Sequence, residues 1–174
     1  MLISFPCFFL TAQGNEHPVS IGPELQFYPA GMIPGVRWSY YLGEQQQNAI
    51  TLRTGINLTL RHDWGKHEDE RGWGTGISSG YNYHFPIRKG KVLFGARGDI
   101  WLMQIHWKKD ARKGESHIVI LQPTAEAGYS FILKNFHIAP TLAFGRELNI
   151  ITKGEPVGEG WILLLGVVFQ WNFE

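Results

Sequence analysis

The segment GWILLLGVVFQWNFE, residues 160–174, decides how the rest of the sequence is interpreted. Its odd-numbered positions are all apolar: Trp161, Leu163, Leu165, Val167, Phe169, Trp171 and Phe173. Its even-numbered positions turn polar toward the end, at Gln170 and Asn172. Alternation with a period of two indicates a β-strand with one continuous apolar face. Because chain ends usually fray in water, such an end predicts a strand that is paired and faces an apolar medium.

The same period of two recurs along the chain, and no segment of useful length has the helical period. We predict eight strands, at residues 19–28, 34–43, 48–62, 73–85, 91–107, 116–131, 135–147 and 158–173. Short connections alternate with longer, charged connections, which lie at residues 62–72, 108–116 and 149–158. Short turns at one end and longer loops at the other are typical of an up-and-down antiparallel barrel.

Composition narrows the class of protein. The 174 residues suffice for one domain, and a net charge of +1 argues against general nucleic-acid binding. The 21 glycines and 14% aromatic residues suit strands and turns better than helices. No run of about 18 apolar residues is present, which argues against a helical membrane bundle.

The first 14 residues differ from the rest. An apolar run from Leu2 to Leu10 precedes Ala12-Gln13-Gly14, which fits a signal-peptidase site, although the usual basic start is missing. We therefore expect residues 1–14 to be a signal peptide and residues 15–174 to form a single barrel domain. The alternative is that this run, which holds the single cysteine Cys7, is a buried first strand.

Periodicity does not say which face points outward. A soluble lipocalin-like calyx would enclose an apolar ligand between Ile50, Leu52, Ile56 and Leu142, whereas a membrane barrel would turn them toward lipid. A soluble barrel carries lysines along its water-facing strand positions. Here every lysine lies in or beside a connection: Lys66, Lys89, Lys91, Lys108, Lys109, Lys113, Lys134 and Lys153. This placement favours the membrane barrel.

The polar face also carries charges of both signs among small residues. They are Glu24, Arg37, Arg53, Arg97, Asp99 and Glu126, with Arg61 and Glu147 nearer the loop end. Buried charges must be paired, and arginine is the preferred cation for buried pairs. We predict an ionic cluster that fills the lumen, the alternative being ordinary exposed strand charges.

Aromatic residues gather on the apolar parity beside the short turns, at Tyr40, Tyr83, Phe85, Phe131, Phe136, Trp171 and Phe173. Trp161 lies at the opposite end of its strand. Aromatic girdles of this kind mark the two membrane interfaces. The sequence thus predicts an all-β fold, an eight-stranded antiparallel up-and-down transmembrane β-barrel.

Three motifs resemble those of small eight-stranded outer-membrane β-barrel proteins of Gram-negative bacteria, especially of the Bacteroidetes group. GYNYHFPI followed by RKGKVLFGARGDI (80–100) resembles a periplasmic hairpin, as does AGYSFILKNFHIAPTLAF (127–144). LLLGVVFQWNF (163–173) resembles the C-terminal assembly signal, although Glu174 follows its final aromatic residue. The resemblance implies location in the outer membrane, contact with its lipids and lipopolysaccharide, and assembly by the outer-membrane insertion machinery. It implies no single activity.

Some barrels of this size modify lipid A, for which they need a serine and a histidine close together. Ser116 and His117 are neighbours on a strand, so their side chains point to opposite faces. The loop at 62–72 gathers His62, His67 and several acids, yet their spacing matches no metal motif. We therefore expect a monomer without catalysis, metal or cofactor, acting structurally or in surface interaction through its loops.

Overall fold

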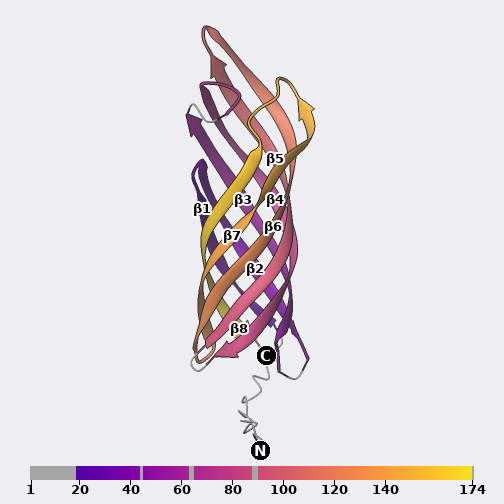
Figure 1. Cartoon of the computed structure of the whole chain (residues 1–174), viewed down its shortest axis with the longest axis vertical. Helices are drawn as coiled ribbons and strands as arrows, with labels where there is room; N and C mark the ends of the chain where they lie inside the picture. The colour runs from indigo at the N-terminus through magenta and orange to yellow at the C-terminus, as the bar shows by residue number, and fades with distance from the viewer. Residues whose placement is uncertain (1–18, 44, 63–64, 88–89, 174) are drawn as a thin grey trace, which may run out of the picture.

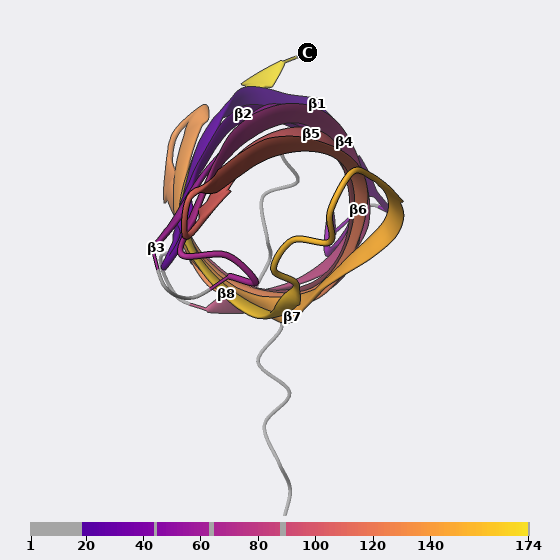
Figure 2. The same cartoon turned by 90° about the horizontal axis from the view of Figure 1, so that it is seen from above.

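The computed structural model describes residues 19–43, 45–62, 65–87 and 90–173. All eight elements are strands, in a closed ring in which each strand pairs antiparallel with the next (Figures 1 and 2). They are β1 (Val19–Tyr28), β2 (Gly31–Leu42), β3 (Asn48–His62), β4 (Asp69–Ile87), β5 (Gly90–Lys109), β6 (Arg112–Leu133), β7 (Phe136–Lys153) and β8 (Gly160–Phe173). The predicted all-β, eight-stranded antiparallel barrel is confirmed. The described residues contain no helix long and apolar enough to cross a membrane.

The ring closes between the first and last strands. Val19 lies opposite Phe173, and Phe27 lies opposite Leu165. On its other side β8 pairs with β7, from Trp171 opposite Phe136 to Gly160 opposite Glu147. The final strand is therefore held on both sides along most of its length, which explains how so apolar a chain end avoids fraying. The proposed signal peptide at residues 1–14 and the last residue, Glu174, lie outside the described residues.

Several hairpins are longer than the sequence predicts. The connection predicted at 108–116 is almost entirely strand, since Lys108 pairs with Lys113 and only a two-residue turn, Asp110–Ala111, separates β5 from β6. Asp110 has the left-handed backbone (φ 53°) that so tight a turn requires. This hairpin rises farthest from the short-turn end (Figure 1). The prediction failed because the backbone pairing of β5 with β6 continues past the point where the apolar alternation stops.

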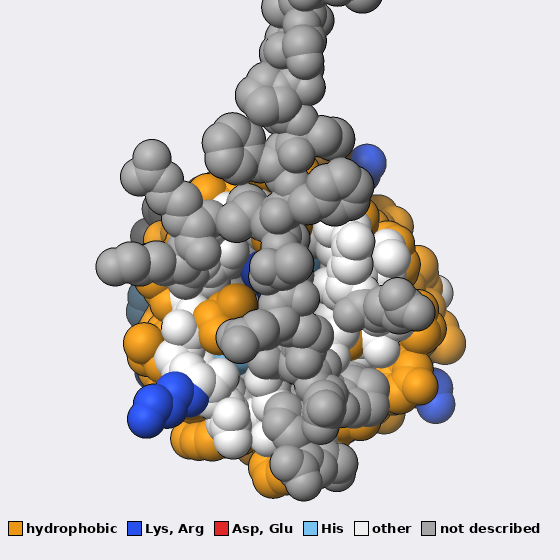
Figure 3. Space-filling model, turned by 90° about the horizontal axis from the view of Figure 1, so that it is seen from below, with side chains coloured by type: hydrophobic (Ala, Val, Ile, Leu, Met, Phe, Trp, Pro, Cys, Tyr) orange, Lys and Arg blue, Asp and Glu red, His pale blue; other side chains and the backbone are white. Residues whose placement is uncertain are grey.

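The apolar parity faces outward on every strand. Ile77 is 66% exposed and Leu102 is 60% exposed on the outer surface. Ile50, Leu52, Ile56 and Leu142, which the calyx alternative placed around an internal ligand, are all exposed outside. That alternative is wrong, because the lumen is filled by other side chains. Seen from the short-turn end, hydrophobic side chains form much of the visible rim, and no described Asp or Glu side chain appears there (Figure 3).

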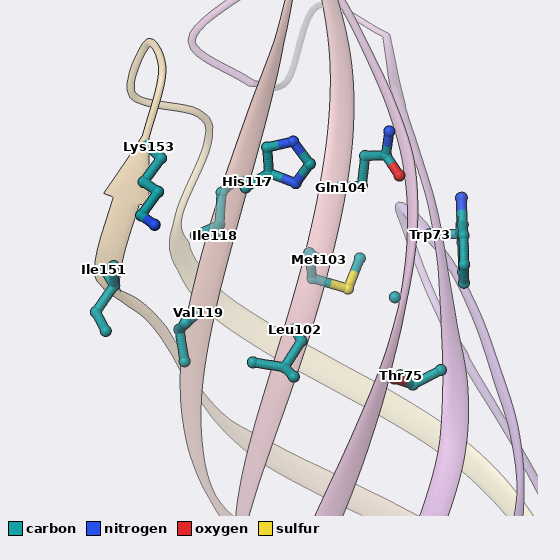
Figure 4. A pocket seen from close by; sticks show the side chains of 11 residues that line it. Trp73, Thr75, Leu102, Met103, Gln104, His117, Ile118, Val119, Ile151 and Lys153 are labelled. Atoms are coloured by element: carbon teal, nitrogen blue, oxygen red, sulfur yellow. The ribbon is translucent and has the colours of Figure 1, made fainter.

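The outer apolar surface ends at the same level on the neighbouring strands β5 and β6. Going up the outward positions, Leu102 on β5 is followed by Gln104, and Val119 on β6 is followed by His117. Figure 4 shows Gln104 and His117 at the height of Lys153, with Leu102 and Val119 below them. A tilted strand crosses a hydrocarbon core in about 9–11 residues, and Val92–Leu102 on β5 has that length. We call this surface the outer apolar belt.

The lumen is filled in two ways. Its middle holds charged side chains, whereas its upper part, toward the β5–β6 hairpin, holds a buried apolar cluster. Members of this apolar cluster include Tyr28, Ile33, Trp101, Met103, Ile105, Ile118, Ile120, Val157, Ile162 and Leu164. The sequence led us to expect a polar interior throughout, and this is wrong for the upper part. There the strands are apolar on both faces, so the inward parity that carries charges in the middle of the lumen carries apolar side chains instead.

Candidate functional site

Six charged residues come together in the middle of the lumen, and we call them the ionic cluster. They come from five strands: Glu24 from β1, Arg37 from β2, Arg53 from β3, Arg97 and Asp99 from β5, and Glu126 from β6. All six are buried. They are the six residues that the sequence predicted as the core of the ionic cluster, and the structure places every one of them in contact with an opposite charge.

Arg37 is the bridge across the barrel. Its Nε and Nη2 donate to the two oxygens of Glu24 at 2.9 and 2.8 Å. Its Nη1 and Nη2 donate to the two oxygens of Glu126 at 2.7 and 2.8 Å. The planar guanidinium thus binds two carboxylates in the forked geometry that only arginine can offer. It ties β2 to β1 and, across the lumen, to β6.

The other two arginines complete the cluster through Asp99. Arg97 donates from Nε to Asp99 at 3.2 Å and from Nη1 to Glu126 at 3.1 Å. Arg53 donates from Nη2 to Asp99 at 3.3 Å. Three arginines therefore face three carboxylates, so the formal charges cancel within the cluster. A neutral, fully paired network can remain ionised away from water, where an unpaired charge could not.

Neutral residues that the sequence analysis did not single out also support the cluster. Gln26 Nε2 donates to Glu24 at 2.7 Å, and Gln26 Oε1 accepts from both Arg53 and Arg97. Trp101 lies above, with the Arg53 guanidinium carbon 5.3 Å from its ring centre. The inward position of Gln26 could have been predicted, because Gln26 shares the parity of Glu24 two residues earlier. Trp101 shares the inward parity of Asp99 two residues earlier in the same way, so its inward position could have been predicted as well.

The outer mouth of the lumen is covered by two connections. The β3–β4 and β7–β8 connections both bend inward over the opening (Figure 2). They meet on Glu70, which is fully buried and accepts from the backbone N–H groups of Lys66 and Gly158 at 3.0 and 3.1 Å. Glu70 also contacts His67 Nδ1 at 3.0 Å. One carboxylate therefore holds both connections in place, and the mouth is closed by the chain itself.

His67 and Ser116 both have structural contacts in this region. The His67 ring stacks on Trp107, with ring centres 4.5 Å apart, and its Nε2 lies 3.3 Å from Glu155. Ser116 is buried, where it donates to the Glu155 carbonyl oxygen at 2.7 Å and accepts from Trp107. His117 is exposed on the outside and contacts Glu115. Ser116 and His117 thus face opposite sides, as their spacing predicts.

The candidate metal ligands of the 62–72 segment are divided between two faces. His62 pairs with Asp69 on the outside at 2.6 Å, whereas His67 and Glu70 lie inside the mouth. Within the described ranges, no group of three or more His, Cys, Asp and Glu side chains is arranged to hold a metal ion. This segment acts instead as a cover for the lumen.

The aromatic residues assigned to the membrane interfaces lie on the outer surface. All of them are exposed except Phe136, which is half-buried: Tyr40, Tyr83, Phe85, Phe131, Phe136, Trp161, Trp171 and Phe173. Near the short turns, Phe136 packs on Trp171 with ring centres 4.8 Å apart. At the other end, Trp161 stacks on Phe144 at 5.2 Å. Trp73, also exposed and opposite Gln104, is a further aromatic residue at the upper edge.

The fold is similar to those of two solved bacterial barrels. The chain superposes on Neisserial surface protein A (NspA) with a TM-score of 0.58 and 13% identity, covering 89% of this chain and 96% of that one. It superposes on the N-terminal β-barrel domain of Pseudomonas aeruginosa OprF with a TM-score of 0.52 and 19% identity, covering 88% and 96%. No protein-family model and no curated protein matches the sequence. At these identities the likeness shows the fold alone, that of outer-membrane eight-stranded barrels.

Proposed function

We propose that this chain is an integral bacterial outer-membrane protein with a closed interior, acting structurally or in surface interaction rather than in transport or catalysis. The observation that carries the proposal is the outer apolar belt. It covers every strand, has the height of a hydrocarbon core, and has aromatic residues at both edges. In water so large an apolar surface would drive aggregation. In a bilayer the same surface would face the lipid chains, and the closed sheet would pair its own backbone groups.

The closed interior argues against diffusion through the barrel. An eight-stranded barrel has an interior just wide enough for its own side chains. Here the ionic cluster occupies the middle, the apolar cluster occupies the upper lumen, and two connections cover the mouth. We expect a planar bilayer containing the pure protein to show no stepwise conductance. A reproducible open channel would contradict this part of the proposal.

The location is tested by cell fractionation. We expect the full chain, expressed in a Gram-negative host, to sediment with the outer membrane on a sucrose gradient. It should also migrate differently on a gel before and after heating, because closed barrels resist the detergent until heated. Recovery of folded protein from the soluble periplasm would contradict the proposal. The mass of the recovered protein reports whether residues 1–14 are removed, and depletion of the insertion machinery in the host tests whether that machinery is required.

The part best placed for surface interaction is the β5–β6 hairpin, which extends beyond the belt. Its tip carries the cations Lys108, Lys109, Arg112 and Lys113 against the acids Asp110 and Glu115. An excess of positive charge near the membrane surface favours anionic partners. We propose the phosphate groups of lipopolysaccharide as that partner, with the protein acting as a monomer.

Binding to lipopolysaccharide is tested with the purified protein in bilayers. A variant with Lys108, Lys109, Arg112 and Lys113 all replaced by serine should fold normally but enrich lipopolysaccharide around it at least several-fold less. The matched control replaces the lysines nearer the short turns, Lys91 and Lys134, in the same way. Equal enrichment by the two variants would contradict the role of the hairpin and leave the membrane location untouched.

A further inference from the structure

The ring of strands is complete only over part of its height. Pairing between β1 and β8 ends at Phe27 opposite Leu165, and β1 stops at Tyr28. β8 continues upward to Gly160 with β7 as its neighbour. The turn of the β1–β2 hairpin leans the other way, because the Leu60 amide donates to the Ala30 carbonyl oxygen at 2.6 Å. Among the described strands, none pairs with residues 160–164 on the side that faces β1.

A pocket of about 300 Å³ lies at this interruption. Its outer wall is apolar and belongs to the belt: Phe144, Trp161 and Leu163. Its inner wall carries the buried charged residues Arg61 and Glu147, and Glu159 lies at its rim. The pocket therefore joins the apolar outer surface to polar groups at the mouth of the lumen, which is the layout required by a ligand with one apolar part and one polar part.

The apolar wall is held in a fixed arrangement. The rings of Trp161 and Phe144 are nearly parallel, with an interplanar angle of 4°. The guanidinium of Arg146 lies 5.8 Å from the Trp161 ring centre. Trp161 is nevertheless 72% exposed, the largest exposed fraction among the exposed hydrophobic residues described. An exposed aromatic surface beside a pocket is available to an alkyl chain.

The polar wall contains an unused hydrogen-bond acceptor. Glu147 is 5% exposed, and its Oε2 accepts from Arg61 Nη2 at 2.6 Å. The other terminal nitrogen of Arg61 donates to the Gly158 carbonyl oxygen at 2.6 Å. Glu147 Oε1 is buried and has no hydrogen-bond partner among the described residues. A buried acceptor without a partner is destabilising, so a ligand that donates a hydrogen bond here would remove that cost.

The charges on the pocket wall select the kind of donor. One arginine faces two carboxylates, and Glu159 is exposed at the rim, where it also accepts from the Asn149 amide. A phosphate or carboxylate head group would meet two carboxylates and one arginine in the pocket lining and would offer no proton to Glu147. An ammonium group offers three donors and a positive charge, and hydrogen bonds between opposite charges are the stronger kind.

We propose that this pocket binds a single-chain amphiphile whose head group is an ammonium. The ammonium pairs with the Glu147 carboxylate once that side chain turns its free Oε1 toward the pocket, and the alkyl chain lies against Trp161, Phe144 and Leu163. The binding chemistry does not depend on where the protein resides. That the ligand arrives sideways from the surrounding lipid does rest on the proposed membrane location.

The test uses the full chain folded in an uncharged maltoside detergent at pH 7.5. The probe is a C16 primary amine that carries a photoreactive diazirine in its chain, and the comparison probe is the matching C16 carboxylic acid. After illumination, mass spectrometry gives the labelling of the segment 144–163 relative to the segment 92–102, which lies on the belt away from the pocket. We expect this ratio to be at least tenfold higher for the amine than for the acid.

Two pairs of variants separate binding from folding. Glu147→Gln removes the carboxylate charge, and we expect it to lower the amine ratio at least fivefold, whereas Glu115→Gln on the outside of β6 should leave it unchanged. Trp161→Ala should lower the ratio as well, whereas Trp171→Ala, an equally outward tryptophan at the other end of β8, should not. The second pair keeps the proposal testable if Glu147→Gln does not fold.

The outcomes are distinct from those of the membrane test. Equal ratios for amine and acid, labelling spread evenly over the belt, or labelling unaffected by Glu147→Gln and Trp161→Ala would overturn the proposal. Because these measurements are made in detergent, they stand whether or not the chain fractionates with the outer membrane. Conversely, failure of the amine to bind would leave the membrane location intact.

Discussion

The middle and the upper lumen are enclosed by the same ring of strands, yet they are filled by different chemistry. On β5 the inward positions change from Arg97 and Asp99 to Trp101, Met103 and Ile105 within a few residues. In the middle, stability depends on directional contacts between opposite charges. Above, it depends on apolar volume. Closure of the sheet therefore does not dictate how its interior is filled. Substitutions in the two regions should lower the free energy of unfolding for different physical reasons.

Trp101 is where the two regions meet. Its ring packs in the apolar cluster, while the Arg53 guanidinium lies over one face and the indole N–H donates to Gln122 Oε1 at 3.1 Å. A tryptophan suits this position because it combines a large apolar surface with one hydrogen-bond donor. Trp101 therefore connects the two regions through a hydrogen bond and a cation–π contact.

Breaking the ionic cluster at Arg37 should have the largest effect. Arg37→Ala leaves Glu24 and Glu126 buried beside each other without their bidentate partner. Removing one member of a buried ion pair costs about 3–5 kcal/mol, and we expect a loss near the middle of that range. The measurement is the free energy of unfolding by urea for protein folded into lipid vesicles.

Arg71→Ala is the matched control, because Arg71 makes an exposed ion pair with Asp69 at 3.3 Å. Exposed pairs of this kind contribute about 0–1 kcal/mol. If the two variants lost the same free energy of unfolding, the buried pairing around Arg37 would not be what stabilises the middle of the lumen.

The faces of the strands and the ionic cluster could be predicted from the sequence, whereas the filling of the upper lumen could not. The parity of β8 predicts its outward and inward faces, because Phe169 and Trp171 alternate with the polar Gln170 and Asn172 near its end. The ionic cluster follows from the cost of leaving charges such as Arg53 unpaired on an inward face. Parity counted from Asp99 also places Trp101 inside, but the apolar upper lumen does not follow, because parity does not give the height at which side chains from different strands meet.

Contacts between distant connections were also beyond reach of the sequence. Nothing in the pattern around Glu70 indicates that its carboxylate binds the amide of Gly158, 88 positions later. The pocket beside Trp161 likewise depends on where β1 stops relative to β8, a matter of register between the two ends of the chain. Strand periodicity predicts faces but not relative heights.

Creating a cavity in the upper lumen should have the next largest effect. Leu164→Ala removes a fully buried side chain of the apolar cluster, and we expect a loss of about 3 kcal/mol. The control is the same substitution one residue further, Leu165→Ala, on the outer belt. Lipid or detergent chains can fill the space left there, so its loss should be clearly smaller. Equal losses would mean that the upper lumen is loosely packed.

The coupling free energy between two charged residues distinguishes a buried ion pair from an exposed one more clearly than the effect of a single variant does. In a double-mutant cycle with Arg37→Met and Glu126→Leu, we expect a coupling free energy of about 2 kcal/mol. For the exposed pair Arg112 and Glu155, whose atoms are 3.3 Å apart, the same cycle should give less than about 1 kcal/mol. A larger coupling at the surface would reverse our ranking of the two environments.

The smallest expected effect lies at the boundary between the two regions. Gln122→Leu leaves the Trp101 N–H without its acceptor, and we expect a loss of about 1 kcal/mol. Trp101→Phe leaves Gln122 Oε1 without its donor and also reduces the apolar volume. In the double variant neither polar group remains unpaired, so its loss should be less than the sum of the two single losses. Strict additivity in the same urea titrations would show that the hydrogen bond adds nothing, and that Trp101 joins the two regions by packing alone.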